Sequence, residues 1–149
     1  MKTAQWEAYL RGMRFITLAV ALVLVAACFF PWVTVPSRQL VLTGVDALNF
    51  GKPAYLHFIF SALAVLLVFI QRPVGQKAAV LFAAFNFAWA LRNFVLLAAC
   101  QMGDCPVRQP AIYVVLVSSV LLLVGVLLVR NKPAPAVSGE GEGETTAVD

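Results

Sequence analysis

Four long apolar stretches, separated by short polar segments, dominate the chain. They cover residues of about 15–33, 54–70, 78–99 and 111–129. A helix needs roughly 20 apolar residues to cross the hydrocarbon core of a bilayer. The pattern therefore predicts an all-α integral membrane protein, with four transmembrane helices in an up-down bundle that occupies residues 1–132.

Prolines stand at the ends of three of these stretches. Pro31 lies at the carboxyl end of the first stretch, where the missing backbone N–H of proline ends a helix. Pro53 and Pro110 precede the second and fourth stretches, and a proline costs little at the first position of a helix. The helix ends are therefore expected near these residues.

The connection between the first two stretches carries a different pattern. Its segments WVTV and QLVLTG are rich in β-branched and apolar residues, and PSR stands between them. Two such segments joined by a turn predict a small β-hairpin between the first two helices, on the extracytoplasmic side. A two-stranded hairpin is only marginally stable alone, so we expect it to pack on the bundle.

Composition and charge narrow the class of protein. Hydrophobic residues make up 62% of the chain and charged residues 12%, whereas a soluble domain averages about 45–50% and about 25%. Lipid must therefore solvate much of the surface. The net charge of +4 comes from scattered cations, and this distribution does not indicate nucleic-acid binding.

The positions of Lys and Arg predict the orientation in the membrane. One side of the predicted bundle collects seven of them: Lys2, Arg11, Arg14, Arg72, Lys77, Arg130 and Lys132. The other side collects three: Arg38, Lys52 and Arg108. Because cytoplasmic loops carry the excess of cations, we expect a bacterial inner (plasma) membrane protein with both termini in the cytoplasm. We call the side with three cations the outer side.

The two ends of the chain have further features. Residues 133–149 alternate glycine and glutamate after a proline-alanine stretch, which predicts a disordered acidic cytoplasmic tail. At the amino end, the sequence VAAC up to Cys28 also resembles a bacterial lipoprotein signal, in which case the first span would be lost. Retention of the first span and cleavage before Cys28 both stay open.

The third stretch contains polar residues in the apolar sequence FNFAWALRNFVLLAAC. Arg92 would lie about 10 Å from its outer end, a depth from which an arginine side chain reaches the headgroups. Asn86 and Asn93 are seven residues apart and share a helix face, which should point into the bundle because asparagine in lipid needs a partner. Trp89 lies beside that face.

Two groups outside this stretch are candidate partners of Arg92. Asp46, in the first outer loop, would neutralise its charge, and we predict an Arg92–Asp46 ion pair. His57 lies one turn into the second stretch, near the same level. A ligand pocket at this level would be lined by Arg92, Asn93, Asn86, His57, Trp89 and Asp46. Hydrogen bonding between helices is the alternative role for the asparagines.

Cys100 and Cys105 flank a short segment of the second outer loop. An extracytoplasmic location permits a disulfide, and we predict a structural disulfide that fixes the end of the third helix. Two free thiols, or a redox-active or metal-binding pair, are the alternatives, although the spacing is not that of a CxxC motif.

The residues exclude several classes of function. No carboxylate lies in any span, which argues against a proton-coupled small multidrug exporter, and no phosphate-binding loop, HExxH motif or hydrolase elbow is present. We therefore expect a non-enzymatic accessory or assembly subunit of a larger membrane complex, without cofactor or metal. Its partners would be membrane lipids and either another protein or a second copy of the chain.

Two alternative functions stay open. The pocket around Arg92 would bind or carry a quinone, a lipid or a lipid-linked anion. Alternatively, Cys100 and Cys105 would carry out thiol–disulfide chemistry.

Overall fold

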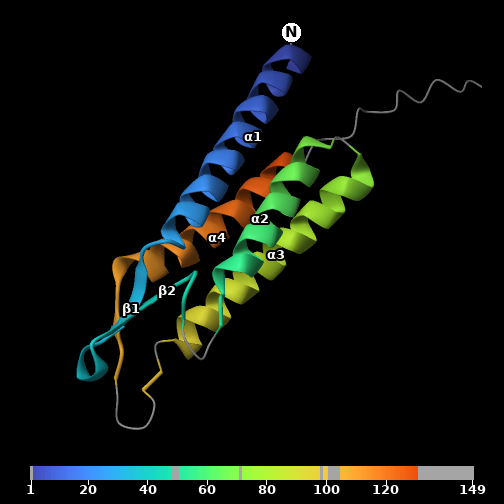
Figure 1. Cartoon of the computed structure of the whole chain (residues 1–149). Coiled ribbons are helices and arrows are strands. Elements are labelled where there is room, and N and C mark those ends of the chain that lie inside the picture. Colours follow the sequence, from blue (N-terminus) through green and yellow to red (C-terminus); the bar gives the residue numbers. More distant parts are fainter. Residues whose placement is uncertain (1, 48–50, 71, 98, 101–104, 131–149) are drawn as a thin grey trace, which may run out of the picture.

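Four helices in alternating directions form the body of the protein (Figure 1). The computed structural model describes residues 2–47, 51–70, 72–97, 99–100 and 105–130. The helices are α1 (Lys2–Ala27), α2 (Ala54–Phe69), α3 (Pro73–Leu96) and α4 (Pro110–Arg130). α4 packs against α1 and α3, and α2 packs against α3. The up-down arrangement expected from the apolar pattern is confirmed, while the predicted tail at 133–149 lies outside the described residues.

Three of the four helices are long and apolar enough to cross a membrane: the Glu7–Ala27 part of α1, α3, and the Pro110–Val129 part of α4. α2 is strongly apolar but has 16 residues. At a rise of about 1.5 Å per residue it spans about 24 Å, against a hydrocarbon core of about 30 Å. The length of α2 therefore does not by itself show a fourth crossing.

The first helix differs in both of its bounds from the predicted span at 15–33. α1 begins at Lys2, and its last turn tightens where the Cys28 backbone N–H donates to the Val25 carbonyl at 3.1 Å. Residues 31–33 lie in a strand instead, since Pro31 cannot continue the helical hydrogen bonding. The prolines before the other helices act as expected: Pro53 directly precedes α2, and Pro110 is the first residue of α4.

A three-stranded antiparallel sheet covers the end of the bundle opposite the start of α1 (Figure 1). We call this end of the bundle the sheet end. The strands are β1 (Pro31–Val35), β2 (Leu40–Thr43) and β3 (Val107–Arg108), in the order β2-β1-β3. β1 and β2 form the predicted hairpin, with the 3-10 turn Pro36–Arg38 between them. β3, which the pattern did not predict, joins the other edge of β1 through the pairs Val33–Arg108 and Thr34–Val107.

Trp32 of β1 fastens the sheet to the bundle. Its side chain is fully buried, and its indole N–H donates to the Ala27 carbonyl at 3.0 Å. Gly44 lies directly against the indole: a Cβ there would sit 2.9 Å from the Cys28 carbonyl oxygen and closer still to the ring. The loop after β2 therefore needs glycine at this position.

The core consists of two clusters along the bundle. The cluster at the sheet end surrounds Trp32, and the other is built on small residues, with Ala64, Ala79 and Ala83 fully buried. Alanines at these positions allow the backbones of α2 and α3 to approach closely. α1 and α4 also lie close together at Gly125, where a Cβ would lie 2.7 Å from the Thr17 Oγ1.

Candidate functional site

A chain of hydrogen bonds between buried side chains joins α2 to α3. His57 Nδ1 lies 2.5 Å from Asn86 Oδ1, and the Asn86 amide nitrogen donates to Ser61 Oγ at 2.9 Å. His57 and Asn86 are fully buried and Ser61 is 2% exposed. His57 and Ser61 are four residues apart on one face of α2, so both reach the same amide. The predicted inward direction of Asn86 is confirmed.

Two buried nitrogens near this chain have no hydrogen-bond partner among the described residues: His57 Nε2 and Asn93 Nδ2. The Trp32 ring meets the His57 ring edge-on, with 6.0 Å between the centroids. Asn93 lies two turns beyond Asn86 on the same buried face of α3. The contact with Trp32 of β1 thus places His57 at the level where the bundle meets the sheet.

Trp89 and Arg92 lie on a different part of α3. Arg92 is exposed, and its guanidinium carbon is 4.7 Å from the centroid of the Trp89 ring. The Trp89 indole N–H donates to the Pro53 carbonyl at 3.0 Å, which fixes the ring against the start of α2. The predicted pocket residues on α2 and α3 therefore fall into a buried set, His57, Asn86 and Asn93, and a second set in which Trp89 is half-buried and Arg92 is exposed.

Asp46 is exposed in the loop after β2, where its backbone N–H donates to Thr43 Oγ1 at 3.0 Å. The Thr43 backbone N–H donates back to the Asp46 carbonyl at 2.9 Å, which closes a tight turn. The Arg92 guanidinium contacts the Trp89 ring. The ion pair between Arg92 and Asp46 stays a prediction.

Cys100 and Cys105 are paired as a disulfide at the sheet end, with their Cα atoms 4.3 Å apart. Cys100 follows α3 and Cys105 precedes β3. The disulfide therefore holds the two ends of the connection between these elements close together. Cys28 carries a free thiol and is fully buried in the cluster around Trp32. Among the described residues, no group of three or more His, Cys, Asp or Glu side chains could hold a metal ion.

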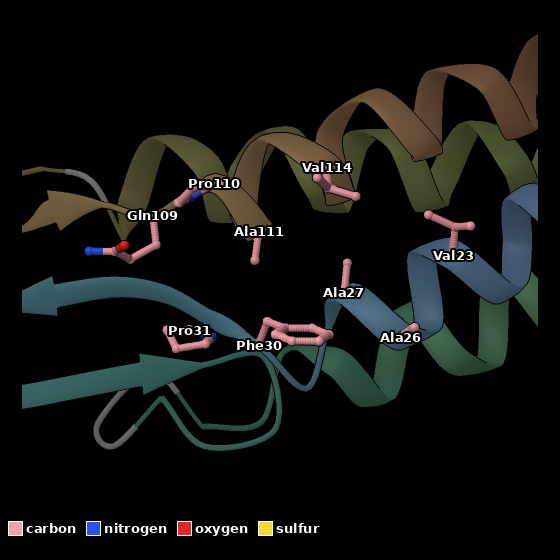
Figure 2. Close-up of a pocket in the computed structure, with 9 residues that line it drawn as sticks. All are labelled: Val23, Ala26, Ala27, Phe30, Pro31, Gln109, Pro110, Ala111 and Val114. Carbon is pink, nitrogen blue, oxygen red and sulfur yellow. The ribbon is translucent and has the colours of Figure 1, made fainter.

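An apolar groove of about 470 Å³ lies between α1 and α4, beside the start of β1. Figure 2 shows Val23 and Ala27 of α1 facing Ala111 and Val114 of α4 across it. Gln109 stands at its sheet end, where its side-chain amide donates to Thr34 Oγ1 at 3.0 Å. The remaining lining residues are Ala26, Phe30, Pro31 and Pro110.

Reasoning from sequence missed both Ser61 and the groove. Ser61 follows His57 by four residues, which places it on the same helix face and could have identified it as a third member of the polar chain. The groove has no comparable pattern, since it depends on how α1 and α4 pack together beside the start of β1.

Comparisons of the chain with protein families, with curated proteins and with solved structures found no match in any of the three.

Proposed function

We propose that this protein is a non-enzymatic accessory or assembly subunit of a larger complex in a bacterial inner membrane. The supporting observation is that buried polar side chains hydrogen-bond to one another between two helices of the bundle. His57, Asn86 and Ser61 bond to one another across the interface of α2 and α3. Hydrogen bonds of this kind hold membrane helices together. They favour a structural role for the buried polar groups over a catalytic one.

In this proposal the chain crosses the membrane four times and both termini lie in the cytoplasm. Tilting of the helices or local thinning of the bilayer accommodates the short α2, at a cost of fractions of a kcal/mol per Å. The distribution of Lys and Arg supports the orientation. The amino end of α1 and the link between α2 and α3, which carry many of the cations, lie at the end away from the sheet (Figure 1).

The groove between α1 and α4 is the surface that we assign to a partner. Ala26, Ala27 and Ala111 present small side chains there, and small residues let a second transmembrane helix approach closely. Val23 and Val114 add exposed apolar surface on either side. The partner is a helix of another protein or of a second copy of this chain.

Photocrosslinking in native membranes tests this assignment. A photoreactive phenylalanine analogue replaces Val114 in the groove or, as a control, Val120, which is equally exposed (40%) elsewhere on α4. We expect the Val114 position to give one discrete protein adduct that is absent at Val120. An adduct of twice the chain mass identifies a second copy. Identical adduct patterns at the two positions, or no protein adduct at either, would contradict the assignment.

A further inference from the structure

Aromatic side chains line one partly exposed flank of the pair formed by α2 and α3. Phe82, Phe85, Trp89 and Arg92 are spaced by three, four and three residues, which keeps them on one side of α3. Phe60 of α2 lies against this row: its ring is stacked 6.4 Å from that of Phe82 and 6.0 Å from that of Phe85. We call these five residues the aromatic flank.

Arg92 lies at the sheet end of the aromatic flank. Its contact with a ring leaves its hydrogen-bond donors available. The guanidinium lies over the Trp89 ring, and that contact engages its face rather than its N–H groups. The indole itself is held by its bond to the Pro53 carbonyl. A fixed ring beneath an exposed guanidinium pre-orients the five donors toward an anion.

The chemistry of that anion follows from the charges nearby. α2, α3 and α4 contain no aspartate or glutamate, so these helices offer Arg92 no carboxylate. Planar guanidinium groups bind phosphate with two parallel hydrogen bonds. In a membrane, the anion available along the flank of a helix bundle is the phosphate of a lipid.

The length of the aromatic flank matches one leaflet. Arg92 and Phe82 are ten residues apart on α3, which is about 15 Å along the helix axis. Half of the hydrocarbon core is also about 15 Å. A lipid with its phosphate at Arg92 would therefore extend one acyl chain along Phe85 and Phe60 to Phe82, inside the hydrocarbon core but short of its centre.

We propose that the aromatic flank binds one anionic phospholipid, with the phosphate on Arg92 and an acyl chain on Phe85, Phe60 and Phe82. This site goes beyond the subunit role and rests on the membrane setting proposed above. The charge of Arg92 favours a lipid over a partner helix on this flank, because an apolar helix would leave the guanidinium without an anion.

Native mass spectrometry of the full-length protein tests the site. The protein is released from nanodiscs that contain equal amounts of dioleoylphosphatidylglycerol and dioleoylphosphatidylcholine. We expect the wild type to retain one phosphatidylglycerol in preference to phosphatidylcholine. Arg92→Gln should lower that retention about tenfold, the loss expected for a charged hydrogen bond. Inorganic phosphate should not displace the lipid, because it makes no contact with the aromatic rings.

Arg108→Gln is the matched control, since the Arg108 guanidinium also lies over a ring, that of Phe94, at 4.8 Å. This variant should retain the lipid as the wild type does. Phe85→Ala is a second test that leaves the core intact, because Phe85 is half exposed, and it should also weaken retention.

Two results would overturn the lipid site: equal retention of both lipids by the wild type, or equal losses in Arg92→Gln and Arg108→Gln. Neither result depends on whether a protein partner is found. The lipid site and the subunit role are therefore tested independently.

Discussion

His57 shows how single residues are used inside this bundle. Its Nδ1 faces the Asn86 carbonyl oxygen, which only accepts, so Nδ1 carries the proton of that hydrogen bond. The amide nitrogen of Asn86 is engaged by Ser61 on the same helix as His57. Asn86 therefore hydrogen-bonds to two polar side chains of α2, and its loss would leave both without this partner.

Replacement of Asn86 by leucine should destabilise the protein by about 1–3 kcal/mol, the cost of leaving buried polar groups unpaired. Ser61→Ala should cost less in the Asn86→Leu background than in the wild type, because the hydrogen bond it removes is already absent. Reversible unfolding in detergent measures both changes. Costs that add fully would show that the two residues are not coupled. Ala88→Leu, on an exposed position of α3, serves as the control for added bulk.

At the scale of elements, local patterns predicted much of the fold. The apolar stretches, the prolines before α2 and α4, and the β1–β2 hairpin depend on neighbouring residues, and the structure contains all of them. α1 starts earlier than predicted because the apolar pattern marks only the part of a helix that lies in lipid. The polar segment from Lys2 continues the helix outside that part. β3 and the pairing of Asn86 with His57 could not be predicted, since they depend on the register of distant segments.

The crossing of α1 and α4 gives a second prediction. Gly125→Ala should destabilise the bundle by about 1–3 kcal/mol, because the new methyl group would overlap Thr17 Oγ1 at 2.7 Å. Thr17→Ala should restore most of that loss in the double variant, since it removes the overlapping oxygen. Melting temperatures in one detergent compare the variants. A double variant no more stable than Gly125→Ala would contradict this account of the crossing.

The whole molecule presents apolar side chains outward along every helix. Phe15 of α1, Leu66 of α2 and Val95 of α3 are each more than half exposed, as is Val117 of α4. In water this apolar surface would stay exposed to an unfavourable solvent. Lipid tails are an apolar solvent for it. The exposed surface of α2 resembles that of the three longer helices, which supports a fourth crossing despite its 16 residues.

The fourth crossing predicts that Ser37 and Lys77 lie on opposite sides of the membrane. Ser37 is in the turn between β1 and β2, and Lys77 is in the first turns of α3, both on the surface. A membrane-impermeant maleimide should label Ser37→Cys in intact spheroplasts and Lys77→Cys only after lysis. Labelling of both in intact spheroplasts, or of neither, would show that α2 does not cross.

The proposed role as a subunit is tested most directly by gentle extraction of the tagged full-length protein from its native membrane. Quantitative mass spectrometry then identifies the proteins that co-elute with it, and the native mass gives their ratio. The account predicts another protein, or a second copy of this chain, in a fixed ratio. A protein that elutes alone as a monomer directly from the native membrane extract would contradict it.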